Sequence, residues 1–333
     1  MKYAIIGIGA IGTVVGAILR KSGNDVLLIV KENQIETISK KGLKVTGLKK
    51  SINVNDIKTT SDLSSLKDTD VIIVCVKSQD TKKLANDIKK YINKSSLFIS
   101  LQNGTRNSEI LEEETGHNAI SGVVMLNALN LNTGEARITI KGGVLLGYKN
   151  KYETEIKIII DSFKKFGLTS YSKRDIKSYQ YSKLIVNLQN AVTALTGQTV
   201  KESIIDSNSR RILTETMKEG MDVLEKSKIP IKTLPEMDPI KIIKRLSFFN
   251  SIFLKLGSRL MKIDNAKTSM LQSILRGKPT EIDYINGEIV RIAKENNLKA
   301  PINNKLVELV KEIEKKDKKI KYNPYELRKI LKL

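Results

Sequence analysis

Short apolar runs alternate with helical periods in the first half of the chain. Between the apolar runs lie segments with helical spacing, such as "AIGTVVGAILRKSG" and "DTKKLANDIKKYI". Strands that alternate with helices in this way predict a parallel sheet covered by helices on both faces. The segment "GEARITIKGGVLLG" (134–147) predicts a hairpin that ends this domain with antiparallel strands. The apolar runs are "KYAIIG", "DVLLIV", "DVIIVCV", "SLFISL" and "NAISGVVML".

After about residue 175 the pattern changes to long helical periods without a convincing strand. A chain of 333 residues is long enough for two domains. We therefore predict an α/β domain with a mainly parallel sheet over 1–172 and an all-α domain over 173–333. The predicted helices cover 176–196, 208–227, 239–261, 281–296 and 302–316.

The charge of the chain favours anionic partners, because 58 basic and 36 acidic residues give a net charge of +22. The lysines are spread along the chain rather than gathered in one basic arm, and aromatic residues for base stacking are few. Small anions such as dinucleotide phosphates and carboxylates account for the charge equally well. We expect a small-molecule partner and no nucleic acid.

The single cysteine, Cys75, excludes an intrachain disulfide and a zinc site built from several thiolates, and we expect no metal. Catalysis by a Ser-His-Asp or Cys-His group would depend on the single histidine, His117. The uncharged run 4–19 imitates a signal peptide, but its glycines weaken a helix and it is too short to span a bilayer. We expect a cytoplasmic protein without a membrane span.

The segment 240–263 has an apolar stripe with lysine and arginine elsewhere. Its members are Ile242, Leu246, Phe249, Phe253, Leu256 and Leu260. Such a helix could lie on an anionic membrane surface, but stripes of this kind are normal in helices that dock on their own domain. A homodimer interface is a further alternative.

The sequence "GIGAIG" follows a predicted strand and opens a predicted helix, the context in which GxGxxG indicates dinucleotide binding. The first glycine allows a tight turn, the second lets the main chain approach a pyrophosphate, and the third lets helix and strand pack closely. The amides at the helix N-terminus then face the phosphates. The predicted cofactor loop comprises Gly7, Ile8, Gly9, Ala10, Ile11 and Gly12.

Three further positions follow the ends of predicted strands, where ligands bind in such sheets. Lys31 stands where an acidic residue would hold the ribose of NAD, so it favours the 2′-phosphate of NADPH, although Glu32 follows directly. Lys77, after "VIIVCV", could face the same phosphate or be a surface lysine. Asn103, in "QNG", could contact the nicotinamide end or form an ordinary turn.

The segment "KLIVNLQN" places three polar residues at helical spacing among apolar neighbours. Lys183, Asn187 and Asn190 are spaced i, i+4 and i+7, so they share one helix face. Reduction of a ketone needs a proton donor and a stabilising positive charge, and a desolvated lysine supplies both. Taken alone, the segment also fits a surface lysine with two surface amides.

A second polar cluster lies in "TSMLQSILRGKPTEIDYING", residues 268–287. Thr280 and Asp283 have the spacing of a capping box, which predicts a helix that begins there and carries Glu281 in its first turn. Glu281 would then favour the helix dipole, or bind a hydroxyl of substrate or cofactor.

Together these motifs resemble the ketopantoate reductase (2-dehydropantoate 2-reductase) family from residue 1 to about 315. The resemblance rests on "GIGAIG", Lys77, "QNG", "SKLIVNLQNAVTAL" and "TSMLQSILRGKPTEIDYING". It implies a Rossmann domain followed by a helical domain similar to that of 6-phosphogluconate dehydrogenase. It also implies NADPH-dependent reduction of 2-dehydropantoate to (R)-pantoate, a step toward coenzyme A.

The resemblance also implies roles for particular residues. Lys183 would donate the proton, while Asn187, Asn190 and Ser269 would bind the substrate. Glu281 would contact a cofactor ribose or a substrate hydroxyl. The remaining positions would bind cofactor, Asn103 and Ala128 at the nicotinamide end and Lys31 and Lys77 near the 2′-phosphate.

Four departures from the family pattern leave the substrate open, and the first is a stretch, 231–263, that is longer and more basic than in compact members of the family. Only Leu188 and Gln189 separate the two asparagines, where the family has three residues; Val200 replaces a further asparagine, and Ser273 an aspartate. A related NADPH-dependent 2-oxoacid reductase and an opine-type dehydrogenase are therefore alternatives. A non-catalytic NADPH-binding regulator is a third alternative, and the presence of both Lys183 and Glu281 argues against it because a sensor needs no proton donor.

Overall fold

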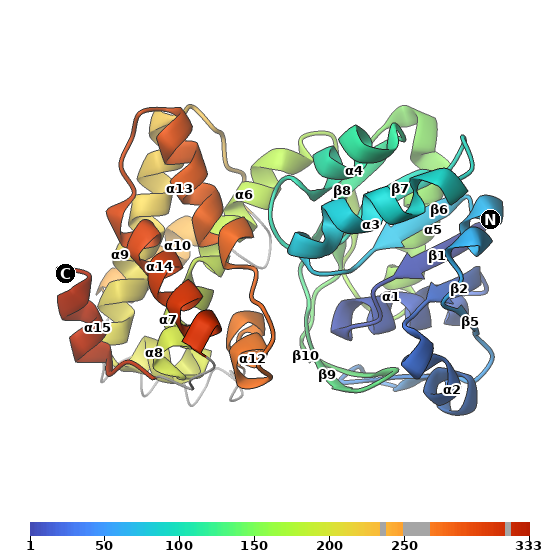
Figure 1. Ribbon diagram of the computed structural model, residues 1–333, viewed down its shortest axis with the longest axis horizontal. Coiled ribbons are helices and arrows are strands. Elements are labelled where there is room, and N and C mark those ends of the chain that lie inside the picture. The colour runs from blue at the N-terminus through green and yellow to red at the C-terminus, as the bar shows by residue number, and fades with distance from the viewer. Residues whose placement is uncertain (234–237, 249–266, 317–320) are drawn as a thin grey trace. The chain divides into compact units, whose positions relative to one another are not determined.

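The structure is a computed structural model that describes residues 1–233, 238–248, 267–316 and 321–333 (Figure 1). It divides into two compact units, Met1–Gln180 and Tyr181–Leu333. This division falls inside helix α6 (Ile176–Asn187), whereas the predicted domain boundary at 172 and 173 precedes that helix.

An eight-stranded sheet forms the centre of the first unit, in the order β12-β11-β8-β7-β6-β1-β2-β5. All neighbouring strands are parallel except β8 and β11, which are antiparallel. The chain leaves β1 through helix α1 to β2 on one side and later enters β6 on the other. The order therefore reverses between β1 and β6, and at such a point a doubly wound sheet binds its ligands. The strands are β1 (Lys2–Ile6), β2 (Asp25–Ile29), β5 (Lys58–Thr60), β6 (Val71–Val74), β7 (Leu97–Ser100), β8 (Ala119–Val124), β11 (Val144–Gly147) and β12 (Tyr171–Lys173).

Helices cover both faces of this sheet, which explains why its central strands β1, β2, β6 and β7 are almost entirely apolar and buried. Helices α1 (Ala10–Lys21) and α5 (Glu153–Lys164) pack on one face, where Ile5 and Ile73 meet Ile18 and Phe163. Helices α3 (Thr81–Ile88) and α4 (Asn107–Thr115) cover the other. This confirms the Rossmann-type fold predicted for the first half.

A smaller sheet in the same unit has the order β4-β3-β10-β9, and it shows that the predicted hairpin at 134–147 is wrong. Strand β10 pairs with β9 and β3, whereas β11 pairs with β8 and β12. The intervening Gly142 and Gly143 pass close to other main chain: an added Cβ would lie 2.5 Å from Met125 O and 2.1 Å from Thr169 O. These glycines thus allow the chain to pass from β10 in one sheet to β11 in the other. The strands are β3 (Leu43–Thr46), β4 (Ile52–Val54), β9 (Asn127–Asn132) and β10 (Glu135–Ile140), and helix α2 is Glu32–Lys41.

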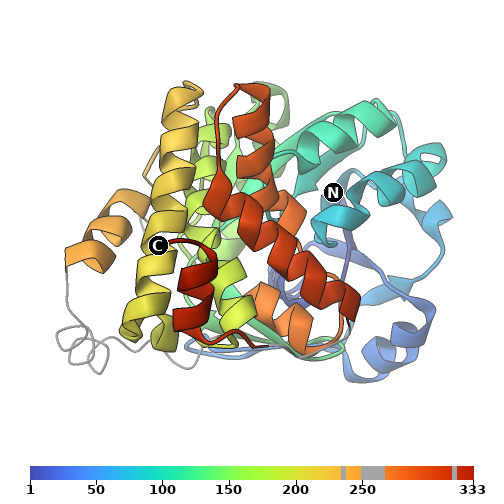
Figure 2. The same ribbon diagram turned by 60° about the vertical axis from the view of Figure 1, so that its left-hand side comes forward.

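Helices are the main structure of the second unit, and its described residues contain loops and turns but no β-strand, as predicted. Helix α9 (Ser207–Lys226) contacts most of the others, and Figure 2 shows α14 crossing beside it. Buried Ile212, Leu213 and Met217 on α9 and Ile289 on α13 belong to one core. The other helices are α7 (Gln189–Thr196), α8 (Val200–Ile205), α10 (Pro239–Phe248), α12 (Ser269–Leu275), α13 (Asn286–Glu295), α14 (Pro301–Lys316) and α15 (Pro324–Ile330).

Short 3₁₀ turns complete the described secondary structure and correct one prediction. Because Ile282–Tyr284 forms such a turn, the helix predicted from residue 281 begins only at Asn286. The predicted capping box is wrong, since the Thr280 hydroxyl accepts a hydrogen bond from Ile282 N (3.3 Å). The other 3₁₀ turns are Leu63–Asp68, Ser78–Asp80, Lys89–Tyr91 and Asn150–Tyr152.

The apolar stripe predicted over 242–260 lies mostly outside the described residues. Ile242 and Leu246 lie on α10 and pack with the core of the second unit, whereas Phe249, Phe253, Leu256 and Leu260 are not described. Among the helices that the structure describes, none is long and apolar enough to cross a membrane.

Candidate functional site

The glycine loop after β1 has the geometry that a dinucleotide pyrophosphate requires. Gly7 has φ of +97°, and a Cβ there would lie 2.6 Å from Val76 N. A Cβ on Gly12 would lie 2.2 Å from Gly7 O, so both glycines are required by packing. At Gly9, in contrast, an added Cβ would meet no atom within 4 Å. Packing therefore does not require glycine at this position, and the open space beside its main chain would admit a phosphate.

Helix α1 begins directly behind this open position. Gly9 is its N-cap residue and has no side chain that could cap the first turn. This turn begins with Ala10 and Ile11. Ile8 is buried, and the loop is fixed to the neighbouring strand because Cys75 N donates to Ile6 O (2.8 Å). The amides and the positive end of the helix dipole therefore lie where they would bind an anion, and the residues present fit a dinucleotide.

The end of β2 separates the two candidates for recognising the cofactor ribose. Lys31 is exposed and is the N-cap residue of α2, immediately after the strand. Glu32 is the first residue of that helix, and its carboxylate accepts a hydrogen bond from the Ser61 hydroxyl. Lys31 is thus exposed for an anion, whereas Glu32 already binds a side chain beyond β5.

The loops after β6 and β7 lie side by side because Val74 pairs with Ser100 in the sheet. Lys77 is partly exposed and precedes the 3₁₀ turn Ser78–Asp80. The main-chain oxygen of Asn103 accepts hydrogen bonds from Ser78 Oγ (2.8 Å) and Asn107 Nδ2 (2.5 Å). These bonds hold the main chain of the "QNG" loop at the carboxyl end of the sheet.

A buried polar network behind Asn103 was not predicted from the sequence. Gln102 Nε2 donates to Val76 O (3.1 Å) and to Thr81 Oγ1 (2.6 Å), and Thr81 Oγ1 donates to Asn107 Oδ1 (2.9 Å). All three polar side chains are buried. Polar residues at such spacing are ordinary in loops, so nothing in the sequence distinguishes them. The network fixes the two loops to each other.

Ala128 lies on β9 of the smaller sheet, opposite Ile138 of β10. Its methyl group is buried with the hydrophobic core of the first unit. Any contact with the nicotinamide would therefore come through its main chain.

Lys183 in the second unit lies on α6 and is only partly exposed. Loss of hydration lowers the pKa of its ammonium group to about 8, although the negative charge of Glu281 acts in the opposite direction. The Glu281 side chain is buried, with 6% of its surface exposed. The structure thus brings together two residues that are almost a hundred positions apart in the sequence. A lysine with such a pKa can donate a proton near neutral pH.

The predicted substrate residues lie on three helices of this unit. Asn187 ends α6 and is partly exposed, Asn190 is buried on α7, and Ser269 is exposed as the first residue of α12. Helices α7 and α12 pack together, and the hydroxyl groups of Thr193 and Thr268 are 2.7 Å apart. Because Thr193 also donates to Asn190 O (3.0 Å), this contact fixes the α7 segment beside the start of α12.

His117 has structural partners. Its Nδ1 lies 2.9 Å from Thr115 O and its Nε2 lies 3.1 Å from Asn93 O, and the ring packs edge-on against Phe98. None of the predicted site residues is among these contacts.

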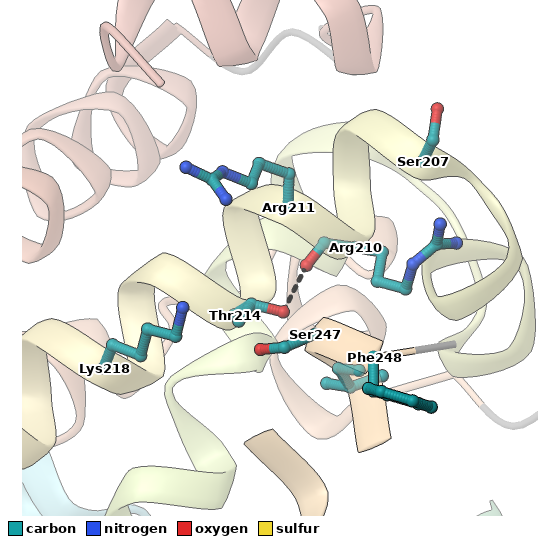
Figure 3. A pocket seen from close by; sticks show the side chains of 8 residues that line it. Ser207, Arg210, Arg211, Thr214, Lys218, Ser247 and Phe248 are labelled. Carbon is teal, nitrogen blue, oxygen red and sulfur yellow. Dashed lines mark hydrogen bonds between the residues drawn. The ribbon is translucent and has the colours of Figure 1, made fainter. Parts of the chain in front are cut away.

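A hollow of about 320 Å³ between α9 and α10 contains none of the predicted site residues (Figure 3). Its cations have partners in the protein: Arg211 and Lys218 lie 3.4 and 3.2 Å from the Glu215 carboxylate, and Arg210 donates to Ile204 O (2.8 Å). These contacts stabilise α8 and α9. The hollow is lined by Ser207, Arg210, Arg211, Thr214, Lys218, Leu246, Ser247 and Phe248.

Comparison with known proteins gives one family for both halves of the chain. The model described as "Ketopantoate reductase PanE/ApbA" matches residues 3–151, and "Ketopantoate reductase PanE/ApbA C terminal" matches residues 175–314. A 2-dehydropantoate 2-reductase of Pyrococcus abyssi is 34% identical, with 93% of this chain and 97% of the relative covered. That of Pyrococcus horikoshii is 33% identical with the same coverage.

Solved structures similar to this chain carry two different enzyme names. A PanE/ApbA family ketopantoate reductase from Ralstonia eutropha has a TM-score of 0.82 and 26% identity, covering 95% of this chain and 99% of its own. A D-mandelate dehydrogenase with NADH and anilino(oxo)acetate has a TM-score of 0.78 and 26% identity, with the same coverage. Solved structures with this fold therefore include both a ketopantoate reductase and a D-mandelate dehydrogenase.

Proposed function

The chain belongs to the ketopantoate reductase PanE/ApbA family, and from this premise we propose that it reduces 2-dehydropantoate to (R)-pantoate with NADPH. The observation that carries the proposal is Lys183, whose pKa is lowered to about 8 by burial and which experiences the negative charge of the buried Glu281. A protein that only senses NADPH has no need of such a proton donor.

Lys183 supplies the proton of the reaction. The nicotinamide cofactor, when bound, supplies a hydride to the carbonyl carbon of the substrate. The oxygen then takes a proton from Lys183, which leaves the lysine neutral until it is protonated again from solvent. The positive charge of Lys183 also stabilises the negative charge that develops on that oxygen. Glu281 supports both roles because its charge favours protonated Lys183.

The choice of NADPH over NADH follows from the end of β2. Lys31 is exposed there and would pair with the 2′-phosphate, while Glu32 binds Ser61. Lys77 would lie near the same phosphate. Gly7, Gly9 and Gly12 would hold the pyrophosphate, and Asn103 and the main chain of Ala128 would lie at the nicotinamide end.

Three polar residues would bind the substrate without adding charge. Asn187 and Asn190 would donate to its carboxylate and carbonyl oxygens, and Ser269 would bind its hydroxyl. A homodimer and a cytoplasmic location stay predictions.

The second candidate is reduction of another 2-oxo acid. It is favoured by the similarity to a D-mandelate dehydrogenase and by the two-residue gap between Asn187 and Asn190. An opine-type dehydrogenase would need an amino acid as co-substrate.

Oxidation of NADPH, followed by its absorbance, distinguishes these functions. Purified protein is tested with 2-dehydropantoate, phenylglyoxylate, 2-oxobutyrate, pyruvate, and pyruvate with amino acids. We expect 2-dehydropantoate to have by far the highest kcat/KM. A higher value for another 2-oxo acid would establish the second candidate, and no oxidation with any of them would contradict both.

A further inference from the structure

The helix that carries the polar face is interrupted at Leu188. Helix α6 ends at Asn187 and α7 begins at Gln189. The Leu188 N–H is shared between two carbonyl oxygens, Leu184 O at 3.1 Å and Ile185 O at 3.3 Å. A shared bond of this kind is a partial change from α-helical to 3₁₀ geometry.

This tightening changes the direction of Asn190 relative to Asn187. An α-helix turns about 100° per residue, so residues three apart lie about 60° out of phase. A 3₁₀ helix turns about 120° per residue, and each tightened residue therefore reduces this difference by about 20°. The geometry at Leu188 thus determines how far Asn190 turns toward the face of Asn187.

Asn286, from the distant "DYING" segment, holds the main chain at this position. Its Nδ2 donates to Leu188 O (3.2 Å) and to Asn303 Oδ1 (3.0 Å). Asn303 Nδ2 in turn donates to Thr216 O (3.2 Å) and to Glu219 Oε1 (2.8 Å). Both asparagine side chains are fully buried, and their partners determine the orientation of both amides.

Helix α9 packs against the side chain of Leu188, the residue whose main chain Asn286 binds. A Cβ on Gly220 would lie 2.5 Å from Leu188 Cδ1 and 2.9 Å from Ile185 Cδ1. Glycine at this position therefore provides the space that the fully buried Leu188 occupies. Asn303 binds the same helix one turn earlier, at Thr216, so the Asn286 and Gly220 contacts belong to one packed group.

We propose that Asn286 is a positioning residue for the substrate, acting through Leu188 to set the direction of Asn190 relative to Asn187 and Lys183. The buried Asn286 side chain binds the main chain where the helix is interrupted. Its hydrogen bonds go to Leu188 and Asn303, not to Asn190 or Lys183. This proposal deepens the proposed function and rests on it. The "DYING" segment would then fix the geometry of the helix break through Asn286, while Glu281, just before this segment, acts on Lys183.

The test is Asn286→Leu, which keeps a similar volume but removes both donors. We expect KM for 2-dehydropantoate to rise roughly tenfold, because Asn190 would no longer be held in the direction that binds the substrate. The NADPH dissociation constant should stay unchanged. The matched control is Thr216→Val, which removes a buried hydroxyl bonded to Ile212 O (2.7 Å) in the same core. It should lower Tm without raising KM.

Gly220→Ala provides a second variant if Asn286→Leu does not fold. Its added methyl displaces Leu188, so it should raise the same KM while leaving NADPH binding intact. A fall in Tm with unchanged KM in the folded variants would overturn the positioning role. Failure of the wild-type protein to reduce 2-dehydropantoate would instead contradict the proposed function.

Amide hydrogen exchange over residues 184–192 tests the positioning role independently of any substrate. Exchange there should accelerate in Asn286→Leu but not in Thr216→Val. Equal exchange in both variants would overturn the inference whichever 2-oxo acid the enzyme reduces.

Discussion

The glycine loop of the first unit and the lysine helix of the second prepare for binding in different ways. The loop is shaped by main-chain atoms and by the absence of side chains. Gly7 and Gly12 pack against other main chain, and Gly9 leaves open space. At the lysine helix, side chains from separate segments are needed, since Lys183 depends on Glu281 and Leu188 on Asn286.

This difference predicts how each region responds to substitution. At a site made of main chain, an added side chain should lower the affinity for the cofactor. A site made of converging side chains fails when one is removed, and it fails in turnover or in substrate KM. Each of the following experiments tests this separation.

The largest effect is expected for Lys183→Ala. Loss of the proton donor should lower kcat by roughly 10²–10⁴-fold, the usual contribution of general acid catalysis. NADPH binding, measured by fluorescence titration, should be unchanged because the glycine loop is in the other unit. Lys218→Ala, which changes a lysine on α9, is the control. Near-normal kcat in Lys183→Ala would remove this residue from the proton-donor role.

Gly9→Ala should weaken NADPH binding about tenfold, equivalent to about 1.4 kcal/mol of binding free energy. Its methyl group enters the space that a pyrophosphate would occupy, and it meets no protein atom within 4 Å. Tm should therefore be preserved. Gly12→Ala is the contrasting variant, because its methyl would collide with Gly7 O and should cost about 1–3 kcal/mol of folding stability. Unchanged NADPH affinity in Gly9→Ala would contradict the proposed position of the pyrophosphate.

Lys31→Ala should raise KM for NADPH about fivefold, which corresponds to the roughly 1 kcal/mol of an exposed ion pair. KM for NADH should change little, since NADH lacks the 2′-phosphate. Raising the salt concentration should reduce the difference. Equal loss for both cofactors would indicate that Glu32 and the ribose hydroxyls determine specificity.

The pH dependence gives the smallest effect but the most direct view of the Lys183–Glu281 pair. Lys183 donates a proton only when protonated, so kcat for reduction should fall as pH rises through about 8. Because the charge of Glu281 raises the pKa of Lys183, Glu281→Gln should move this fall to lower pH. An unchanged profile in that variant would show that the two groups do not interact during turnover.

The local patterns of the sequence determined much of the fold and of the cofactor loop. Alternating apolar runs specify buried parallel strands, and "GIGAIG" specifies its turn because all its contacts are made within a few residues or to the adjacent strand. The same reasoning failed at 134–147, where Gly142 and Gly143 fit against Met125 and Thr169 rather than forming a hairpin. Close contacts with distant main chain leave no periodic signal in the sequence.

The helical spacing of Lys183, Asn187 and Asn190 could likewise be predicted, together with the candidate role of Lys183. Only the tertiary structure decided its pKa, the break at Leu188 and the donor that holds it. Each of these depends on groups far away in the sequence, such as Glu281 for Lys183 and Asn286 for Leu188. Desolvation and long-range hydrogen bonds arise from packing, and a one-dimensional pattern does not contain them.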